Sequence, residues 1–359
     1  MSATEQVEAN NLVYTIDHDR TTVYWAVITG GVTDEIFRDF SAPGFAVELT
    51  RTDLGTRTTD SGLFAIAGYP KQSFPQLSTT SYVVNLVLSA PGFRDFPLAV
   101  TIPVNATFPV AAPTAAMRRL PVRIQGRVVN DATSAPSSGA VIVSVDNPAT
   151  PPTVHTTALR SPLYFAHASG ANVQSVTMTT VLTPSLTQDA NAGATILNLS
   201  NRTGLAANSI VRLSNATKTL MEYAVVDHLG SGAASAPGQA FLRNALNRTY
   251  TAVNTTVEFV TAAVAGAGPT LTSDANVGDG VLLATQLFTG TMVVESGSAA
   301  VAEYHEVGAI SDANGFYGLD GMGRVQEIFL QATQGALKQT TGWFLEYDQP
   351  INLVDFRIQ

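Results

Sequence analysis

Two Glu-Tyr pairs come closest to residues whose type and spacing could do chemistry. Glu222-Tyr223 and Glu303-Tyr304 lie in two similar stretches of the chain. Two carboxyl groups can hydrolyse a glycosidic bond when they face each other across a sugar, but an acid and a base need different surroundings. Because the two glutamates occupy equivalent places, we interpret them as structural strand residues. The sequence alone leaves paired-acid chemistry open.

The histidines do not form a catalytic or metal-binding pattern. His305-Glu306 resembles the start of a zinc-protease motif, but position 309 is Ala where the second histidine would stand. No nucleophile elbow or phosphate-binding loop is present, and Gly321-Met322-Gly323 lacks the third glycine of a dinucleotide turn. The sequence predicts a protein that is not an enzyme, with no catalytic, cofactor-binding or metal-binding residues. An enzyme would require His305, Glu306 and another acid to converge in one cleft.

Two Asp-rich turns offer calcium binding as an alternative. Residues 274–279 and 312–315 place side-chain oxygens at alternate positions, as calcium loops do. The twelfth positions are Thr285 and Gly323, so neither loop has the closing carboxylate. Asp and Asn also bind their own backbone in tight turns without any ion, and we favour that interpretation.

Several aromatic residues could stack on a sugar or fill the core of a β-sandwich. Core packing is the more usual role. The residues concerned are Trp25, Tyr82, Trp343, Phe344 and Tyr347.

Composition excludes several classes of protein. The 359 residues are 45% hydrophobic and 13% charged, which is typical of half-buried strands and polar turns. The net charge of −9 repels nucleic acid. There is no cysteine, so disulfides are excluded and the redox compartment stays undetermined. The N-terminus lacks an apolar export segment, and no run approaches the roughly 20 apolar residues of a membrane span.

Alternating strands and glycine turns predict an all-β chain of several modules. After an N-terminal tail at 1–11, a first sandwich is expected over 12–109 and a proline-rich linker over 110–121. A second, discontinuous sandwich is expected over 122–180 plus 309–359. Its last part repeats the order of the first module, because residues 312–316 correspond to 60–64 and residues 327–332 correspond to 85–90.

The stretch between the two parts of the second module contains a repeat of its own. Leu-Thr-Gln-Asp-Ala-Asn-Ala-Gly at 186–193 recurs as Leu-Thr-Ser-Asp-Ala-Asn-Val-Gly at 271–278, and each copy is followed by one of the Glu-Tyr pairs. The sequence therefore predicts an inserted, pseudo-duplicated β-domain over 181–308.

The outer modules share a Gly-x-Val strand, an Asp-Gly turn before an aromatic residue, and an apolar strand ending in Ala. This pattern resembles the carboxypeptidase regulatory-like, transthyretin-like family of domains. The resemblance implies tandem transthyretin/Ig-like β-sandwiches, the second interrupted by the insertion. The insertion, at 192–199, 222–226 and 242–246, looks like short β-modules of phage-tail proteins.

The arrangement is similar to accessory structural proteins of contractile injection systems. It implies a non-catalytic adaptor that contacts several protein subunits of a ring-like or tail-like particle, assembled in the cytoplasm and then released. It implies no cofactor, nucleic acid or membrane span. The alternative is a carbohydrate-binding or adhesive β-sandwich protein.

Overall fold

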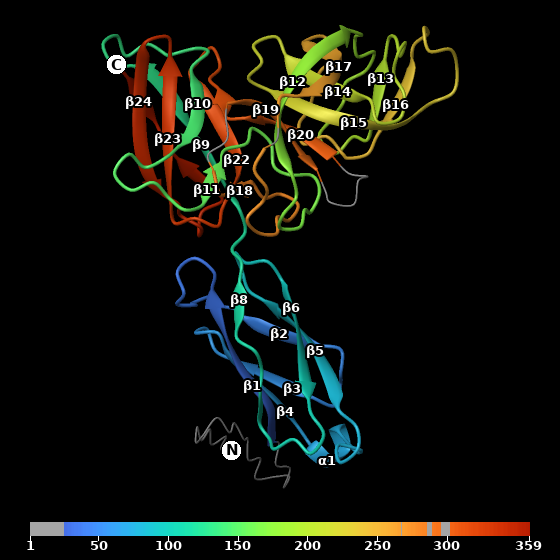
Figure 1. Cartoon of the computed structure of the whole chain (residues 1–359), viewed down its shortest axis with the longest axis vertical. Coiled ribbons are helices and arrows are strands. Elements are labelled where there is room, and N and C mark those ends of the chain that lie inside the picture. The colour runs from blue at the N-terminus through green and yellow to red at the C-terminus, as the bar shows by residue number, and fades with distance from the viewer. Residues whose placement is uncertain (1–24, 267, 286–288, 296–301) are drawn as a thin grey trace, which may run out of the picture. The chain divides into compact units, whose positions relative to one another are not determined.

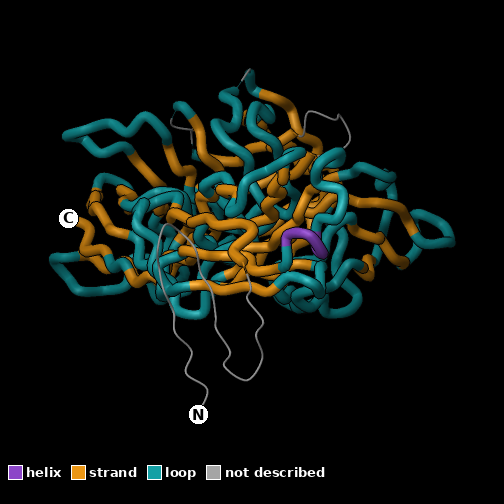
Figure 2. The backbone as a smooth tube through the Cα atoms, turned by 90° about the horizontal axis from the view of Figure 1, so that it is seen from below, coloured by secondary structure: helices purple, strands orange, loops and turns teal. Residues whose placement is uncertain are grey.

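The computed structural model describes residues 25–359 except 267, 286–288 and 296–301. The expected tail at 1–11 and the start of the first module, up to residue 24, lie outside the described residues. The described chain is all-β: strands dominate, and its single helical element is the four-residue α1 (Pro70–Ser73) (Figures 1 and 2). It divides into two compact units, Met1–Leu120 and Pro121–Gln359. None of the helical structure described is long and apolar enough to cross a membrane.

The described residues of the first unit, 25–120, form two sheets. The order of one is β3-β4-β1-β7, with β8 also paired to β1, and the order of the other is β2-β5-β6. Strand β5 shows why this sequence forms a half-buried strand, because Val84, Leu86 and Leu88 are buried while Val83 and Val87 are exposed. The strands are β1 (Trp25–Asp34), β2 (Ala46–Leu49), β3 (Gly55–Thr58), β4 (Leu63–Gly68), β5 (Tyr82–Ser89), β6 (Phe96–Ile102), β7 (Val110–Ala111) and β8 (Ala115–Met117).

The segment expected to be a linker at 110–121 differs from that expectation. Its strands β7 and β8 both pair in parallel with β1, and Ala115 and Met117 are buried in the core of the first unit. The prolines interrupt the alternation that would reveal a strand. Two short pieces still pair because each lies at the edge of the sheet, and the division between the units falls only at Leu120.

In the second unit, the two ends of the predicted discontinuous module lie in the same sheets. Strand β9 pairs antiparallel with β22 and parallel with β25 and β26. Strand β10 pairs with β21 and β23, and β23 continues to β24. These strands are β9 (Val122–Asn130), β10 (Val141–Val145), β21 (Ala309–Ile310), β22 (Phe316–Met322), β23 (Glu327–Gln334), β24 (Leu337–Phe344), β25 (Ile351–Leu353) and β26 (Phe356–Ile358).

The connectivity of these sheets matches that of the first unit. In each, the first strand pairs antiparallel with the strand that follows the Asp-Gly turn and parallel with a final strand split into two pieces. In both units the carbonyl of the turn glycine accepts a hydrogen bond from the first strand. Val32 N donates to Gly62 O at 3.0 Å, and Val128 N donates to Gly315 O at 2.8 Å.

The described residues between β10 and β21 form ten strands. Eight of them make one sheet in the order β13-β16-β15-β14-β17-β12-β19-β20, and β11 pairs with β18 (Figure 1). They are β11 (His155–Thr157), β12 (Val173–Leu182), β13 (Ile196–Leu199), β14 (Ile210–Asn215), β15 (Met221–Leu229), β16 (Gly238–Leu242), β17 (Thr255–Val264), β18 (Val281–Leu283), β19 (Gly290–Glu295) and β20 (Ala302–Val307). This structure therefore starts earlier than the expected boundary at 181, since β11 and β12 already pair within it.

The segment is joined to the neighbouring sheets by contacts around one strand end. Asp320 N donates to Leu159 O at 2.9 Å, and Gly280 N donates to Gly321 O at 2.7 Å. The carboxylate of Asp320 binds Arg123 at 2.5 Å and Arg248 at 3.0 Å. A Cβ on Gly280 would lie 2.7 Å from Gly321 O, so the two backbones approach closely here and fix the inserted segment against β22.

Candidate functional site

Both Glu-Tyr pairs place their glutamate inside the segment between β10 and β21. Glu222 on β15 is 1% exposed and Glu303 on β20 is 2% exposed. Each faces a loop that lies across the end of its strand. In the half of the segment that contains the first copy of the repeat and Glu222, this loop is 243–250. In the half that contains the second copy and Glu303, it is 160–167.

Glu222 accepts hydrogen bonds from three donors. Asn247 N donates to Oε1 at 2.7 Å, Tyr250 Oη donates to Oε2 at 3.3 Å, and Tyr164 Oη makes a short bond to Oε1. Burial raises the pKa of Glu222 despite these donors. Burial also raises the pKa of Tyr164 well above its ordinary value, and the neighbouring Glu222 adds to this.

Glu303 accepts from four donors. Tyr164 N and Phe165 N donate at 2.6 and 3.2 Å, His305 Nε2 lies at 2.8 Å, and His167 Nε2 makes a short contact. Burial acts to raise the pKa of this carboxyl, but the bonds from His167 and His305 outweigh burial and hold the pKa at about 2. Each half thus buries a glutamate, but the surroundings raise the pKa of Glu222 and lower the pKa of Glu303.

The two loops are structural equivalents at different places in the chain. Gly193 N donates to Leu246 O and Gly278 N donates to Leu163 O. Ala190 pairs with Tyr250, and Ala275 pairs with His167. In the first half the loop follows β15, the strand that carries Glu222. In the second half the loop comes before β20, the strand that carries Glu303. The loop that faces the buried glutamate therefore stands at a different place in the chain order in each half.

Sequence reasoning missed the loop at 158–167 because it lies before both copies of the aligned repeat. A signal was present: Leu159-Arg160 and Leu163 match Leu242-Arg243 and Leu246 in type and spacing. Recognising it would have required comparing the halves in different chain orders.

His305 and Glu306 do not converge on one cleft. They are neighbours on a strand, so their side chains point to opposite faces. His305 contacts Glu303 on the buried face, whereas Glu306 accepts hydrogen bonds from Thr291 Oγ1 at 2.9 Å and Tyr223 Oη at 3.3 Å.

Ser161, His305 and Glu303 are arranged in the order of nucleophile, base and acid. Ser161 Oγ lies 3.2 Å from His305 Nδ1, whose Nε2 contacts Glu303. All three members of this hydrogen-bonded arrangement are shielded from solvent, because Ser161 is 3% exposed, His305 0% and Glu303 2%. In this structure the hydrogen bonds hold the 160–167 loop against β20 and do not face solvent.

The opposite pKa shifts predict opposite pH effects on stability. A carboxyl with a lowered folded pKa stabilises the fold above its unfolded pKa, and this stabilisation is lost as the pH falls. For Glu303 the loss runs from about 4.5 to about 2. Glu222, with a raised pKa, contributes most at low pH and loses that contribution as the pH rises through its folded pKa.

Urea unfolding from acid to neutral pH would check this for the native chain, Glu303→Gln and Glu222→Gln. We expect the stability advantage of the native chain over Glu303→Gln to shrink on acidification, and its advantage over Glu222→Gln to grow. Parallel pH profiles for all three proteins would contradict the assignment.

The Asp-rich turns bind backbone groups. Asp312 Oδ1 accepts from Asn314 N and Phe316 N, both at 2.8 Å, and Asp279 Oδ2 accepts from Asn276 N at 2.9 Å. Asp274 Oδ1 accepts from Ser169 N at 2.8 Å. The bonds of Asp312 and Asp279 lie within their own turns and support the turn interpretation, whereas the bond of Asp274 reaches a distant loop. Within the described part of the chain, no three His, Cys, Asp or Glu residues are placed to hold a metal.

The aromatic residues considered for sugar stacking are divided between the two units. Tyr82 packs on Phe74 in the first unit, while Trp343 Nε1 donates to Asn352 at 3.1 Å in the second. Tyr347 is buried, and Trp25 and Phe344 are exposed. The five residues therefore do not form one platform within a single unit.

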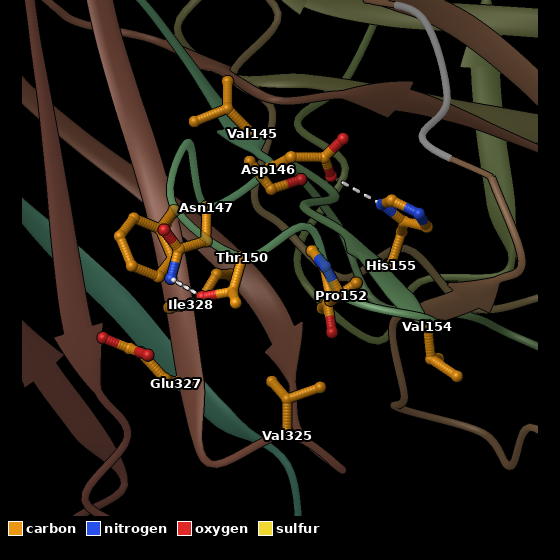
Figure 3. Close-up of a pocket in the computed structure, with 13 residues that line it drawn as sticks. Val145, Asp146, Asn147, Thr150, Pro152, Val154, His155, Val325, Glu327 and Ile328 are labelled. Carbon is orange, nitrogen blue, oxygen red and sulfur yellow. Dashed lines mark hydrogen bonds and ion pairs between the residues drawn. The ribbon is translucent and has the colours of Figure 1, made fainter.

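A cavity of about 240 Å³ opens between the 146–154 loop and the start of β23 (Figure 3). His155 Nδ1 lies 2.6 Å from Asp146 Oδ1, and Asn147 Nδ2 donates to Thr150 Oγ1 at 3.4 Å. Glu327 lies on the side away from His155. Unlike the buried glutamates, these polar groups reach an open pocket.

The chain has only weak similarity to known proteins. No protein-family model matches the chain, and no curated protein matches it. Among solved structures, it is similar to the TIE protein of Bacillus anthracis over 97% of this chain, with 9% identity and a TM-score of 0.21. It is also similar to the major pilin subunit of Bacillus cereus over 92% of this chain and 98% of the pilin, with 7% identity and a TM-score of 0.21. The chain spans 58% of the length of the TIE protein.

Proposed function

We propose that the chain is a non-catalytic structural adaptor of a phage-tail-like particle, a contractile injection system, in which it contacts other protein subunits. The observation that carries this proposal is the attachment of the segment between β10 and β21 to its neighbouring sheets by hydrogen bonds and ion pairs of Asp320, Gly321 and Gly280. Such a block holds its surfaces at fixed positions, as an adaptor must. The proposed route is assembly in the cytoplasm followed by release with the particle.

We further propose that the two outer modules are transthyretin-like sandwiches of common origin, the second interrupted by the pseudo-duplicated segment. The matching strand connectivity and the matching use of Gly62 and Gly315 support this. The burial of Ser161, His305 and Glu303 supports a non-catalytic role.

Co-sedimentation tests the adaptor proposal. The tagged full chain, expressed in cells that make such particles, should sediment with purified particles and remain attached at moderate salt. A tagged soluble protein of similar size is the control. If the chain stays in the supernatant whenever particles pellet, the proposal fails.

One observation favours the alternative of a carbohydrate-binding or adhesive protein. In the first unit, Trp25, Tyr69 and Phe108 line a groove of about 510 Å³, and Trp25 is 52% exposed. Exposed aromatic faces in a concave site suit sugar rings. A glycan array with the native chain and Trp25→Ala distinguishes the two: saturable binding that disappears in the variant would support the alternative.

A further inference from the structure

We propose that the pocket between the 146–154 loop and β23 receives an arginine side chain of a partner protein. This inference rests on the proposed adaptor function and adds the chemistry of one contact. The pocket lies within the second unit, so its walls are fixed relative to each other. Its volume of about 240 Å³ is below the roughly 300–1,000 Å³ of typical small-molecule sites, and it suits a side chain better than a cofactor.

The charge of the pocket favours a cation. Asp146 and Glu327 both line it, and its lining contains no lysine or arginine. Asp146 uses Oδ1 to bind His155. Among the described residues, Asp146 Oδ2 and both oxygens of Glu327 have no hydrogen-bond or ion-pair partner. Carboxylate oxygens that lack donors are the natural acceptors for a guanidinium group.

The remaining lining favours arginine over a small inorganic cation. Pro152, Val154 and Val325 form apolar parts of the wall (Figure 3), and Phe329 also lines it. Such a wall matches the aliphatic stem of an arginine and the flat face of its guanidinium. A metal would need more ligands than the pocket offers, because the described residues hold no metal-binding group of three.

The contact between Asp146 and His155 also orients the site. His155 is held by Asp146 with side-chain exposures of 12% and 35%, so the bond fixes the Asp146 carboxylate toward the pocket. The net charge of −9 would steer a basic partner surface toward the chain.

NMR titration of the isotope-labelled full chain tests the proposal, with N-acetyl-arginine amide as the probe. We expect saturable shifts, in the millimolar range, of the amide signals of residues 146–156 and 325–329. N-acetyl-citrulline amide has nearly the same shape without the charge and should bind at least tenfold more weakly. Added salt should weaken the arginine interaction.

Variants locate the interaction. Asp146→Asn and Glu327→Gln should each weaken arginine binding at least tenfold. Asp227→Asn is the matched control, because Asp227 also pairs with a histidine, His228, at 2.8 Å, and both side chains are exposed near the end of β15; it should bind like the native chain.

Three results would overturn the inference: equal binding of citrulline or lysine amide, shifts caused by calcium but not by arginine, or unchanged binding by Asp146→Asn. The adaptor proposal is tested independently of the arginine pocket. A chain that sediments with particles but ignores arginine refutes only this pocket assignment, and a chain that binds arginine but never sediments with particles refutes only the adaptor.

Discussion

Replacing Glu303 by alanine is expected to lower the free energy of unfolding of the second unit by about 3–5 kcal/mol. The carboxylate accepts hydrogen bonds from His167, His305 and the backbone of the 160–167 loop. Removing it leaves these donors buried without a partner, and each such group carries a desolvation cost.

The measurement is urea unfolding followed by tryptophan fluorescence. The chain has two tryptophans, Trp25 in the first unit and Trp343 in the second. In a Trp25→Phe background, Trp343 alone reports on the second unit. The Glu327→Ala variant is the control, because that carboxylate is exposed and without a partner among the described residues; it should change stability by less than about 0.5 kcal/mol. Equal effects of the two substitutions would contradict the structural role of Glu303.

Replacing Gly126 by alanine is expected to destabilise the second unit by about 3 kcal/mol or more, at the upper end of the cost of overpacking. A Cβ at this position would lie 1.8 Å from Val354 O and 2.6 Å from its carbonyl carbon. These are backbone atoms between β25 and β26, which both pair with β9. The substitution would push the last strand away from the sheet.

The matched control is Gly323→Ala. Its added Cβ would meet Pro121 at 3.5 Å, an ordinary contact, and its backbone does not require glycine. Unfolding of both variants, again followed by Trp343, should show a loss only for Gly126→Ala. A native-like unfolding midpoint for Gly126→Ala would show that β25 and β26 do not cross β9 as described.

Local patterns in the sequence were sufficient to predict strands and turns. Alternation in residues such as Val84, Leu86 and Leu88 follows from the two-residue period of a strand, and it needs no knowledge of the partner strand. Asp312 was interpreted correctly as a turn residue because its hydrogen bonds reach only a few residues along the chain. The repeated Glu222 and Glu303 likewise indicated equivalent strand positions.

The sequence did not reveal which distant groups would meet. Apart from His305, the donors to Glu303 come from the 160–167 loop, far earlier in the chain, and this loop lies before both copies of the repeat. The edge strands at 110–117 were also not predicted, because prolines interrupt the alternation of apolar and polar residues. Pairing with β1 still provides hydrogen-bond partners for their backbone groups.

What the sequence by itself determined is the all-β character of the chain, the position of most strands and the presence of a repeat, since these depend on neighbouring residues. Tertiary structure alone decided the partners of Glu222 and Glu303, the close approach at Gly126 and the pocket beside Asp146. The physical reason is that hydrogen bonds and van der Waals contacts act over a few ångströms in space, whatever the separation along the chain.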